Sequence, residues 1–433
     1  MSVKLKFTAA GDAIIQRPIQ EDFAGFSELT PFIMQGDARF FNLETTLNRE
    51  GEAYGSQFSG GTYIRTNPEV LDGLMELGFN MTSFNNNHVL DFGYPGMLAT
   101  LRYVEESGLV HAGVGDNLAA ASAPRYLETK NGRVALIAVN TSFNATCMAG
   151  KQTERVPGRP GINGIRIEEK FTVTEDELAF IRALSTRLRV NVSREIVRRE
   201  GYYPPLADNE AEFGELKFTL GDETKRTLVP KKADLDRLAK SIYEAKLQAD
   251  YIMISVHSHQ IDGYTKEDVP AFLQEIAHFA IDAGADAVVG HGPHLLRPIE
   301  VYKEKPIFYS LGDFVLELYS IEFAPDDFFA KQNMDGNETV HALLKKRSQD
   351  FTVGLMEEKK MMETVIPYWE TEDGCLTALR LMPVELSKGG HKSDEGLPRK
   401  AQNPVFMERL AEMCKPYGIT MEKDADGAYT CKW

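Results

Sequence analysis

The segment Gly290–His294 reads GHGPH and carries two histidines, His291 and His294, directly after a short apolar run at 286–289. We expect the run to be a buried strand and the glycine–proline segment to be the turn that follows it. Imidazole nitrogen is the commonest protein ligand for divalent transition metals. Open α/β sheets place their chemistry at turns of this kind. The segment therefore indicates a metal-dependent site, and the nearby Arg297 is a candidate contact for negative charge on a substrate.

A second pair of histidines, His257 and His259, follows the apolar segment 251–256. Side chains alternate between the two sides of an extended chain, so both imidazoles would point to the same side. We expect His257, which is nearer to the strand, to be a metal ligand. His259 is either a further ligand or a contact for substrate. The alternative is a chance pair of surface histidines.

Three consecutive asparagines precede a histidine in the segment 83–93. The amide oxygen of Asn87 is a hard metal ligand, and we assign Asn86 to substrate binding. His88 can act as a proton donor, with Asp91 orienting its imidazole. This composition is unusual for a protein core, so it favours a functional site over an asparagine-rich turn.

Carboxylates follow the first two expected strands, at Asp12 and at Glu44. A carboxylate just beyond an apolar run is costly unless it meets a cation. An ordinary Gly-Asp turn at the first position, and a helix-capping or exposed glutamate at the second, are equally good interpretations. With the asparagine and histidines, these carboxylates form a mixed nitrogen and oxygen ligand set that suits Mn, Fe or Zn. We expect one or two such divalent ions. Two ions bridged by a carboxylate would activate water and hold an oxyanion.

Short apolar segments alternate with helical patterns, which indicates βαβ units, a mostly parallel sheet and an α/β fold. The last expected strand runs into a Gly-Asp turn at 312–313. We expect strands at 5–10, 38–42, 81–84, 134–140, 251–256, 287–289 and 305–314, and helices at 68–77, 94–107, 232–247 and 268–283.

The pattern changes over 165–235, where charge is dense and several arginines cluster. We interpret this segment as a charged, partly helical insertion, with helices at 173–188 and 191–200 and a hairpin around Gly221-Asp222. It divides a core into a first half, 1–164, and a second half, 236–320. Residues 321–433 would form a C-terminal extension that packs on the core, with two strands in 365–386 and a polar loop at 387–400.

Composition excludes some classes of protein. The 433 residues carry a net charge of −16 and no long basic block, which argues against nucleic acid as the main partner. No signal-peptide core and no apolar run long enough for a membrane span are present. Four scattered cysteines without a CxxC pair predict free thiols in a reducing cytosol. We therefore expect a cytoplasmic protein whose partner is a small-molecule or polyanionic substrate, and the sequence leaves its oligomeric state open.

Taken in order, the motifs resemble the CapA family, the poly-gamma-glutamate capsule biosynthesis proteins of the calcineurin-like metallophosphatase superfamily. The resemblance covers about residues 3–165 and 235–316 and rests on Gly11-Asp12, Asn42-Leu43-Glu44, Asn86-Asn87-His88 with Asp91 and Gly93, His257 and Gly290–His294. It implies a four-layer α/β/β/α sandwich with metal ions at the strand ends. The implied ligands are Asp12, Glu44, Asn87, His257, His291 and His294, with His88 as proton donor and Asp91 as its support.

The chain departs from the pattern of this superfamily at several positions. Metallophosphatases usually begin with Asp-x-His, whereas Asp12 is followed by Ala13 and Ile14, so one ligand of the first metal is missing. Glu44 stands where a second aspartate is usual. His259 follows His257 where Trp-Gly is common, and it is a candidate for the lost ligand. Capsule-assembly members carry an N-terminal membrane anchor, and we expect none here.

These observations favour a metal-dependent hydrolase of metallophosphatase fold that acts on a phosphoester or on a γ-glutamyl or other amide polyanion. The alternative is a non-catalytic accessory of poly-gamma-glutamate synthesis or export that binds the polymer without turnover. The missing Asp-x-His histidine favours the accessory. The group formed by Asn87, His88 and Asp91 favours the enzyme.

Overall fold

The computed structural model describes residues 2–433 as a mixed α/β protein with several sheets. The chain divides into two compact units. The larger combines residues up to 165 with residues 233–433, and the smaller comprises residues 166–232.

The larger unit contains a ten-stranded sheet in which β1 lies near the middle. On one side of β1, strands β2, β5 and β6 follow in parallel, while the strands on the other side along the main path come from the C-terminal part of the chain. The order is β23 (Thr420–Lys423), β24 (Tyr429–Lys432), β21 (Cys375–Leu386), β20 (Glu363–Glu372), β1 (Lys4–Ile14), β2 (Ala38–Leu43), β5 (Met81–Ser83) and β6 (Val110–Ala112), with β19 (Asp313–Leu316) also beside β1 and β22 (Pro398–Lys400) beside β21.

A six-stranded sheet provides the other half of the core, and its four central strands run parallel. Because both faces of these strands are covered, they are continuous apolar runs rather than alternating ones. The order is β17 (Ile299–Tyr302), β18 (Lys305–Phe308), β16 (Ala287–His291), β15 (Tyr251–His257), β9 (Arg133–Asn140) and β8 (Arg125–Glu128).

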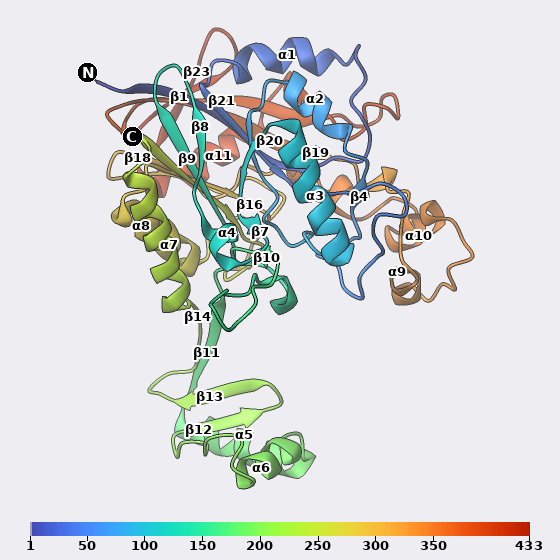
Figure 1. The fold of residues 1–433 in the computed structure, drawn as a ribbon, viewed down its shortest axis with the longest axis vertical. Coiled ribbons are helices and arrows are strands. Elements are labelled where there is room, and N and C mark those ends of the chain that lie inside the picture. The colour runs from blue at the N-terminus through green and yellow to red at the C-terminus, as the bar shows by residue number, and fades with distance from the viewer. Residues whose placement is uncertain (1) are drawn as a thin grey trace. The chain divides into compact units, whose positions relative to one another are not determined.

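Apolar side chains of the two sheets share one buried cluster, to which β1 contributes Phe7 and β15 contributes Met253. A second cluster joins the ten-stranded sheet to the helices α1 (Ala24–Ile33), α2 (Val70–Glu76) and α3 (Gly93–Ser107). Figure 1 shows α7 (Lys232–Lys246) and α8 (Ala271–Ala283) beside the six-stranded sheet, on the side away from α1, α2 and α3.

Shorter elements complete the larger unit. They are α4 (Leu118–Ser122), α9 (Asp326–Lys331), α10 (Val340–Arg347), α11 (Phe406–Cys414), the paired strands β3 (Thr46–Leu47) with β4 (Arg65–Thr66) and β7 (Val114–Gly115) with β10 (Gly161–Ile162), and the 3-10 helices η1 (Ala145–Cys147), η2 (Leu318–Ser320), η3 (Leu355–Glu357), η4 (Lys359–Met362) and η5 (Lys415–Tyr417).

The smaller unit has its own sheet, which the sequence pattern did not indicate. The two expected helices are present as α5 (Glu175–Leu188) and α6 (Val192–Arg199). The strand order is β12 (Glu210–Phe213), β13 (Leu216–Leu220), β11 (Ile167–Val173) and β14 (Lys225–Pro230).

The hairpin expected around Gly221-Asp222 is wrong, because β11 lies between β13 and β14 and pairs with both. This pairing brings Phe171 against Phe218, with ring centroids 5.3 Å apart. A local hairpin would lack that contact between residues distant in the chain.

The structure also splits the single strand expected over 305–314. Residues 305–308 form β18 of the six-stranded sheet, and the chain then crosses to the ten-stranded sheet, where β19 begins at Asp313. The crossing places residues 311 and 312 between the two sheets: Leu311 donates its N–H to Gly290 O, and Gly312 O accepts from Asp12 N. The segment 305–314 therefore links the edges of both sheets.

The region 365–386 forms two strands, β20 and β21, that belong to the ten-stranded sheet itself. Trp369 of β20 is wholly buried, stacks on Phe7 at 5.0 Å and donates its indole N–H to the hydroxyl of Tyr251 at 3.0 Å. One side chain thus connects the C-terminal strands to both sheets.

Replacing Trp369 by Ala should lower the free energy of unfolding by about 3–5 kcal/mol, because the loss of a large buried ring leaves a cavity and removes a buried hydrogen bond. The Trp433→Ala variant is the control, since that side chain is 47% exposed and its loss should change stability by less than about 0.5 kcal/mol. Urea unfolding followed by circular dichroism measures both changes. Equal stability of the two variants would contradict the role given to Trp369.

All four cysteines are free thiols in the structure. Within residues 2–433, none of the helices combines the length and the apolar character needed to cross a bilayer.

Candidate metal centre

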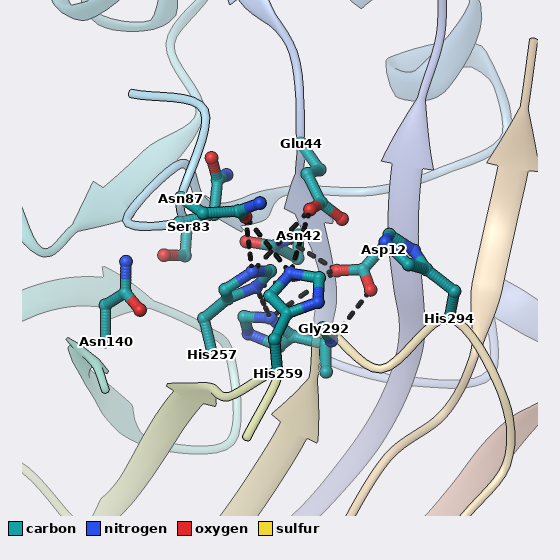
Figure 2. A network of polar contacts seen from close by, with 12 residues as sticks. Asp12, Asn42, Glu44, Ser83, Asn87, Asn140, His257, His259, Gly292 and His294 are labelled. Carbon is teal, nitrogen blue, oxygen red and sulfur yellow. Dashed lines mark hydrogen bonds and ion pairs between the residues drawn. The ribbon is translucent and has the colours of Figure 1, made fainter. Parts of the chain in front are cut away.

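The candidate residues meet where the carboxyl ends of the parallel strands of both sheets come together. In the ten-stranded sheet, Asp12 lies in register with Asn42 on one side and Asp313 on the other. In the six-stranded sheet, His257 lies in register with His291. Figure 2 shows Asp12, Asn42 and His257 pointing toward one another, together with Glu44 and Asn87 from the segments after β2 and β5.

Strand β1 is irregular at the site, and glycine permits this. The pairing of β1 shifts register around Gly11 and Asp12, as in a β-bulge. A Cβ atom at Gly11 would lie 1.8 Å from the carbonyl oxygen of Gly312, so no larger residue fits between the two segments. The close approach turns Asp12 toward the six-stranded sheet. Its Oδ1 accepts from Asn42 Nδ2 at 2.7 Å and its Oδ2 from Gly292 N at 2.8 Å.

The first group able to hold a cation comprises Asp12, His257 and His291. Asp12 Oδ1 lies 3.5 Å from His291 Nδ1 and 3.9 Å from His257 Nδ1. The two Nδ1 atoms are 2.9 Å apart, and His291 Nε2 contacts Ser255 Oγ at 2.7 Å, which fixes the ring. Burial lowers the pKa of His291 to about 3 and holds that of His257 well below its usual value. Both imidazoles are therefore neutral at pH 7, the form that binds metals.

The second group comprises Glu44, His259 and His294. His259 Nε2 lies 3.5 Å from Glu44 Oε1 and 3.2 Å from the amide oxygen of Asn87. The same amide oxygen lies 2.8 Å from His257 Nε2, so Asn87 joins the two groups. His259, for which the sequence indicates either a ligand role or a substrate contact, lies among the potential ligands.

Asp313 also belongs to the site, although the sequence interpretation did not select it. Asp12, Glu44, His294 and Asp313 form a third set of potential ligands, and His294 Nδ1 contacts Asp313 Oδ1 at 2.9 Å. The sequence does contain a pattern that could have identified Asp313, because Gly312-Asp313 repeats Gly11-Asp12. Its partner His294 has a φ of 63°, a left-handed conformation that is uncommon outside glycine and recurs at functional sites.

Whether a cation fits this site can be judged from the buried carboxylate oxygens that have no hydrogen-bond partner. Glu44 is wholly buried, and neither of its carboxylate oxygens has a hydrogen-bond partner. Burial, together with the charges of Asp12 and Asp313, raises the pKa of Glu44 well above 4.5, and burial raises that of Asp12 to about 7. A buried carboxylate that lacks a donor is expensive unless it is neutralised. Neutral imidazoles and partnerless carboxylate oxygens are a donor set that fits a divalent transition metal.

His88 and Asp91 form a pair at the edge of the ligand groups. His88 Nδ1 contacts Asp91 Oδ2 at 2.7 Å, and His88 Nε2 lies 3.8 Å from Glu44 Oε1. The backbone N–H groups of Gly60 and Ile64 donate to the Asp91 carboxylate at 2.8 and 3.0 Å. Asp91 is therefore held by the backbone and fixes the imidazole so that Nε2 faces the ligands.

The side chains of two predicted substrate contacts, Asn86 and Arg297, form hydrogen bonds with the backbone. Both polar atoms of the buried Asn86 side chain bond to backbone: Nδ2 donates to Leu43 O at 2.8 Å and Oδ1 accepts from His88 N at 3.1 Å. Arg297 is wholly buried, and its Nε and Nη2 donate to the carbonyl oxygens of Lys266 and Gln260. The structure thus uses Asn86 to shape the turn that carries His88, and Arg297 to hold the loop after His259.

Replacing Arg297 by Met should make the bond after Lys266 about tenfold more susceptible to trypsin, because the loop 260–266 loses two hydrogen bonds that close it. Limited proteolysis with mass spectrometry measures the cleavage. The Arg102→Met variant is the control, since that side chain is half exposed and contacts Glu52 on another surface. Equal cleavage in the two variants would contradict the clamp.

Comparison with known proteins agrees with the motifs. The family model described as bacterial capsule synthesis protein PGA_cap matches residues 6–317. Uncharacterized protein y4sH of Sinorhizobium fredii is 34% identical over 429 residues, which cover 96% of this chain and 90% of that protein. Capsule biosynthesis protein CapA of Bacillus anthracis is 23% identical over 72% of this chain and 60% of its own length.

A third relative is the probable polyglutamine synthesis accessory protein of Mycobacterium tuberculosis, which is 26% identical over 64% of this chain and 55% of its own length. The family model alone spans well over half of the residues. The chain therefore belongs to the bacterial capsule synthesis protein PGA_cap family.

Proposed function

We propose that this protein is a hydrolase that depends on divalent metal ions and cleaves a phosphoester, on a four-layer α/β/β/α fold of metallophosphatase type. The observation that carries the proposal is the buried meeting of two potential ligand groups around Glu44, next to the His88–Asp91 pair. The order of helices, sheet, sheet and helices in the larger unit supports the fold type.

Asp12, His257 and His291 would hold one cation, and Glu44, His259 and His294 a second, with Asn87 beside both groups. Asp313 and His259 supply donors that compensate for the absent Asp-x-His histidine. Bound Mn, Fe or Zn ions would lower the pKa of water and neutralise charge on a phosphoryl group.

Side-chain and backbone groups of the protein would hold the proton donor and orient the ligands. Asp91 keeps Nδ1 of His88 occupied, so that a proton on Nε2 is available to the leaving oxygen. Asn42 and Gly292 orient the Asp12 carboxylate. The burial of the ligands excludes bulk water from the space between the two sheets.

The names of the relatives favour a second candidate function, a non-catalytic accessory of capsule or polyglutamate synthesis that binds polymer. One relative is named a capsule biosynthesis protein, and another a probable polyglutamine synthesis accessory protein. Metal-dependent hydrolysis could also cleave a γ-glutamyl or other amide bond, so a compound with such a bond belongs among the substrates to be tested.

The test is a hydrolysis screen of protein loaded with Mn, Fe or Zn, using p-nitrophenyl phosphate, bis-p-nitrophenyl phosphate and γ-glutamyl p-nitroanilide. The proposal expects phosphoester turnover that is lost in the Asp12→Ala/His291→Ala variant. Absence of turnover on every substrate, combined with binding of poly-γ-glutamate, would establish the accessory function instead.

A further inference from the structure

A cavity of about 520 Å³ adjoins the candidate metal centre within the larger unit. Leu295, which lines it, is the residue after His294. The apolar cluster around the cavity also includes Ile64, whose N–H holds Asp91. A third link is Arg347 of the lining, which donates to the hydroxyl of Thr62 in the loop that carries Ile64. Leu295 therefore connects the cavity to the ligand His294, and Ile64 and Thr62 connect it to the loop that holds Asp91.

The wall of the cavity is mainly apolar. Most of it comes from the segments that follow β19, namely η2, η3, η4 and the end of α10. The apolar lining consists of Leu295, Leu318, Tyr319, Leu344, Val353, Leu355, Met356 and Met361. Methionine and leucine side chains adapt to aromatic or branched groups, and a cavity of this size holds a body larger than a single sugar or glycerol.

The charges on the wall favour an anion. Lys360 is already paired with Glu267. Arg347, in contrast, bonds to a neutral hydroxyl and has no carboxylate within 4.0 Å in the part of the chain that the structure describes. Lys266 provides a further positive charge at the rim. The lining carries three cations, Lys266, Arg347 and Lys360, and two carboxylates, Glu267 and Glu358, so its net charge is positive in a protein whose net charge is −16.

The chain itself connects Lys266 to the metal centre. Arg297 holds both ends of the loop that follows His259, through the carbonyl oxygens of Gln260 and Lys266. The position of the Lys266 backbone is therefore fixed relative to that of His259.

We propose that this cavity binds the organic part of the substrate, an aromatic or branched-alkyl body with an anionic group that pairs with Arg347, while the scissile phosphoester lies at the metal centre. The proposal rests on the function proposed above and specifies its substrate class. A glutamate polymer, which has carboxylates but no bulky apolar body, would leave most of this wall uncovered.

Anilinonaphthalene sulfonate, an aryl anion that fluoresces in apolar sites, is the probe. Its dissociation constant should rise about tenfold in Arg347→Gln, which removes a charge-assisted bond. It should rise by a similar factor in Val353→Trp, which fills the cavity from a position that is 41% exposed and so tolerates the change. The controls are Lys345→Gln on the same helix and Val190→Trp, an equally exposed valine of the smaller unit. Neither control residue lines the cavity.

The rate of phosphoester hydrolysis is the second measurement. Wild-type protein loaded with metal should cleave naphthyl phosphate with a kcat/KM about tenfold above that for glycerol phosphate, because only the former fills the cavity. Naphthyl phosphate should also displace the dye. Dye binding by both cavity variants that equals wild type would overturn the cavity proposal, whether or not phosphoesters are cleaved. Dye binding that depends on Arg347 and Val353 without any phosphoester turnover would support the cavity and overturn the proposed hydrolase.

Discussion

Replacing His88 by Asn should lower the hydrolysis of alkyl phosphates by about 10²–10⁴-fold while the metal content stays unchanged. His88 Nε2 lies at the edge of the ligand groups, and its Nδ1 is committed to Asp91. An asparagine fills similar space but cannot deliver the proton that a poor leaving group needs. The loss should therefore be small for p-nitrophenyl phosphate, whose leaving group is stable as an anion, and large for an alkyl phosphate.

The control for this variant is His278→Asn. His278 also pairs with a carboxylate, Glu300 at 3.0 Å, but it lies on α8 outside the three ligand groups. Its replacement should leave the rate and the metal content at wild-type values. An unchanged rate on an alkyl phosphate in His88→Asn would remove the catalytic assignment of His88 and Asp91.

Replacing Glu44 by Gln should have opposite effects on metal binding and on stability. The variant should lose at least one metal equivalent, because a carboxamide brings no charge to the second ligand group. Without metal, its thermal midpoint at pH 8 should exceed that of the wild type by about 2–4 °C. The gain arises because the wild type must bury a carboxylate with no hydrogen-bond partner.

The difference in stability between the metal-free variant and the metal-free wild type should depend on pH. The folded pKa of Glu44 lies well above 4.5, so the metal-free wild type loses stability as the pH rises from about 4.5 through that raised value. Glutamine does not titrate, and the advantage of the variant should therefore shrink toward acid pH. Calorimetry of both metal-free proteins between pH 4.5 and 8 measures the difference.

Glu363→Gln provides the matched control. Glu363 is also buried, but its carboxylate is paired with Arg409 at 2.7 Å. Removal of that charge should lower the midpoint and leave the metal content unchanged. If Glu44→Gln behaved in the same way as Glu363→Gln, the orphaned carboxylate would have no part in metal binding.

Sequence periodicity was sufficient for the elements that carry the site, because the central strands are buried on both faces and end in conspicuous turns. Asp12 and His257 lie near the ends of β1 and β15, and Glu44 and Asn87 follow β2 and β5, so the carboxyl ends of strands from both sheets bring them together. Asp313 was missed because its strand begins rather than ends at the site, after a crossing between sheets that no local pattern marks.

The sheet of the smaller unit was not predicted from the sequence because its strands are largely exposed or half-buried. Strand β11 is largely exposed or half-buried, so its residues carry little of the apolar alternation by which strands are recognised. Arg297 illustrates a different limit. The sequence predicts a substrate contact from a positive charge beside two histidines, but no local pattern reveals the hydrogen bonds of Arg297 to two carbonyl groups of a distant loop.

The most direct test of the proposed metal centre is the metal content per chain, by elemental analysis of protein purified without chelator. We expect about two equivalents of Mn, Fe or Zn, lost together in the Asp12→Ala/His291→Ala variant, whose substitutions remove two members of the first ligand group. Absence of metal from the wild-type protein, even after reloading with each of the three ions, would contradict a metal-dependent hydrolase.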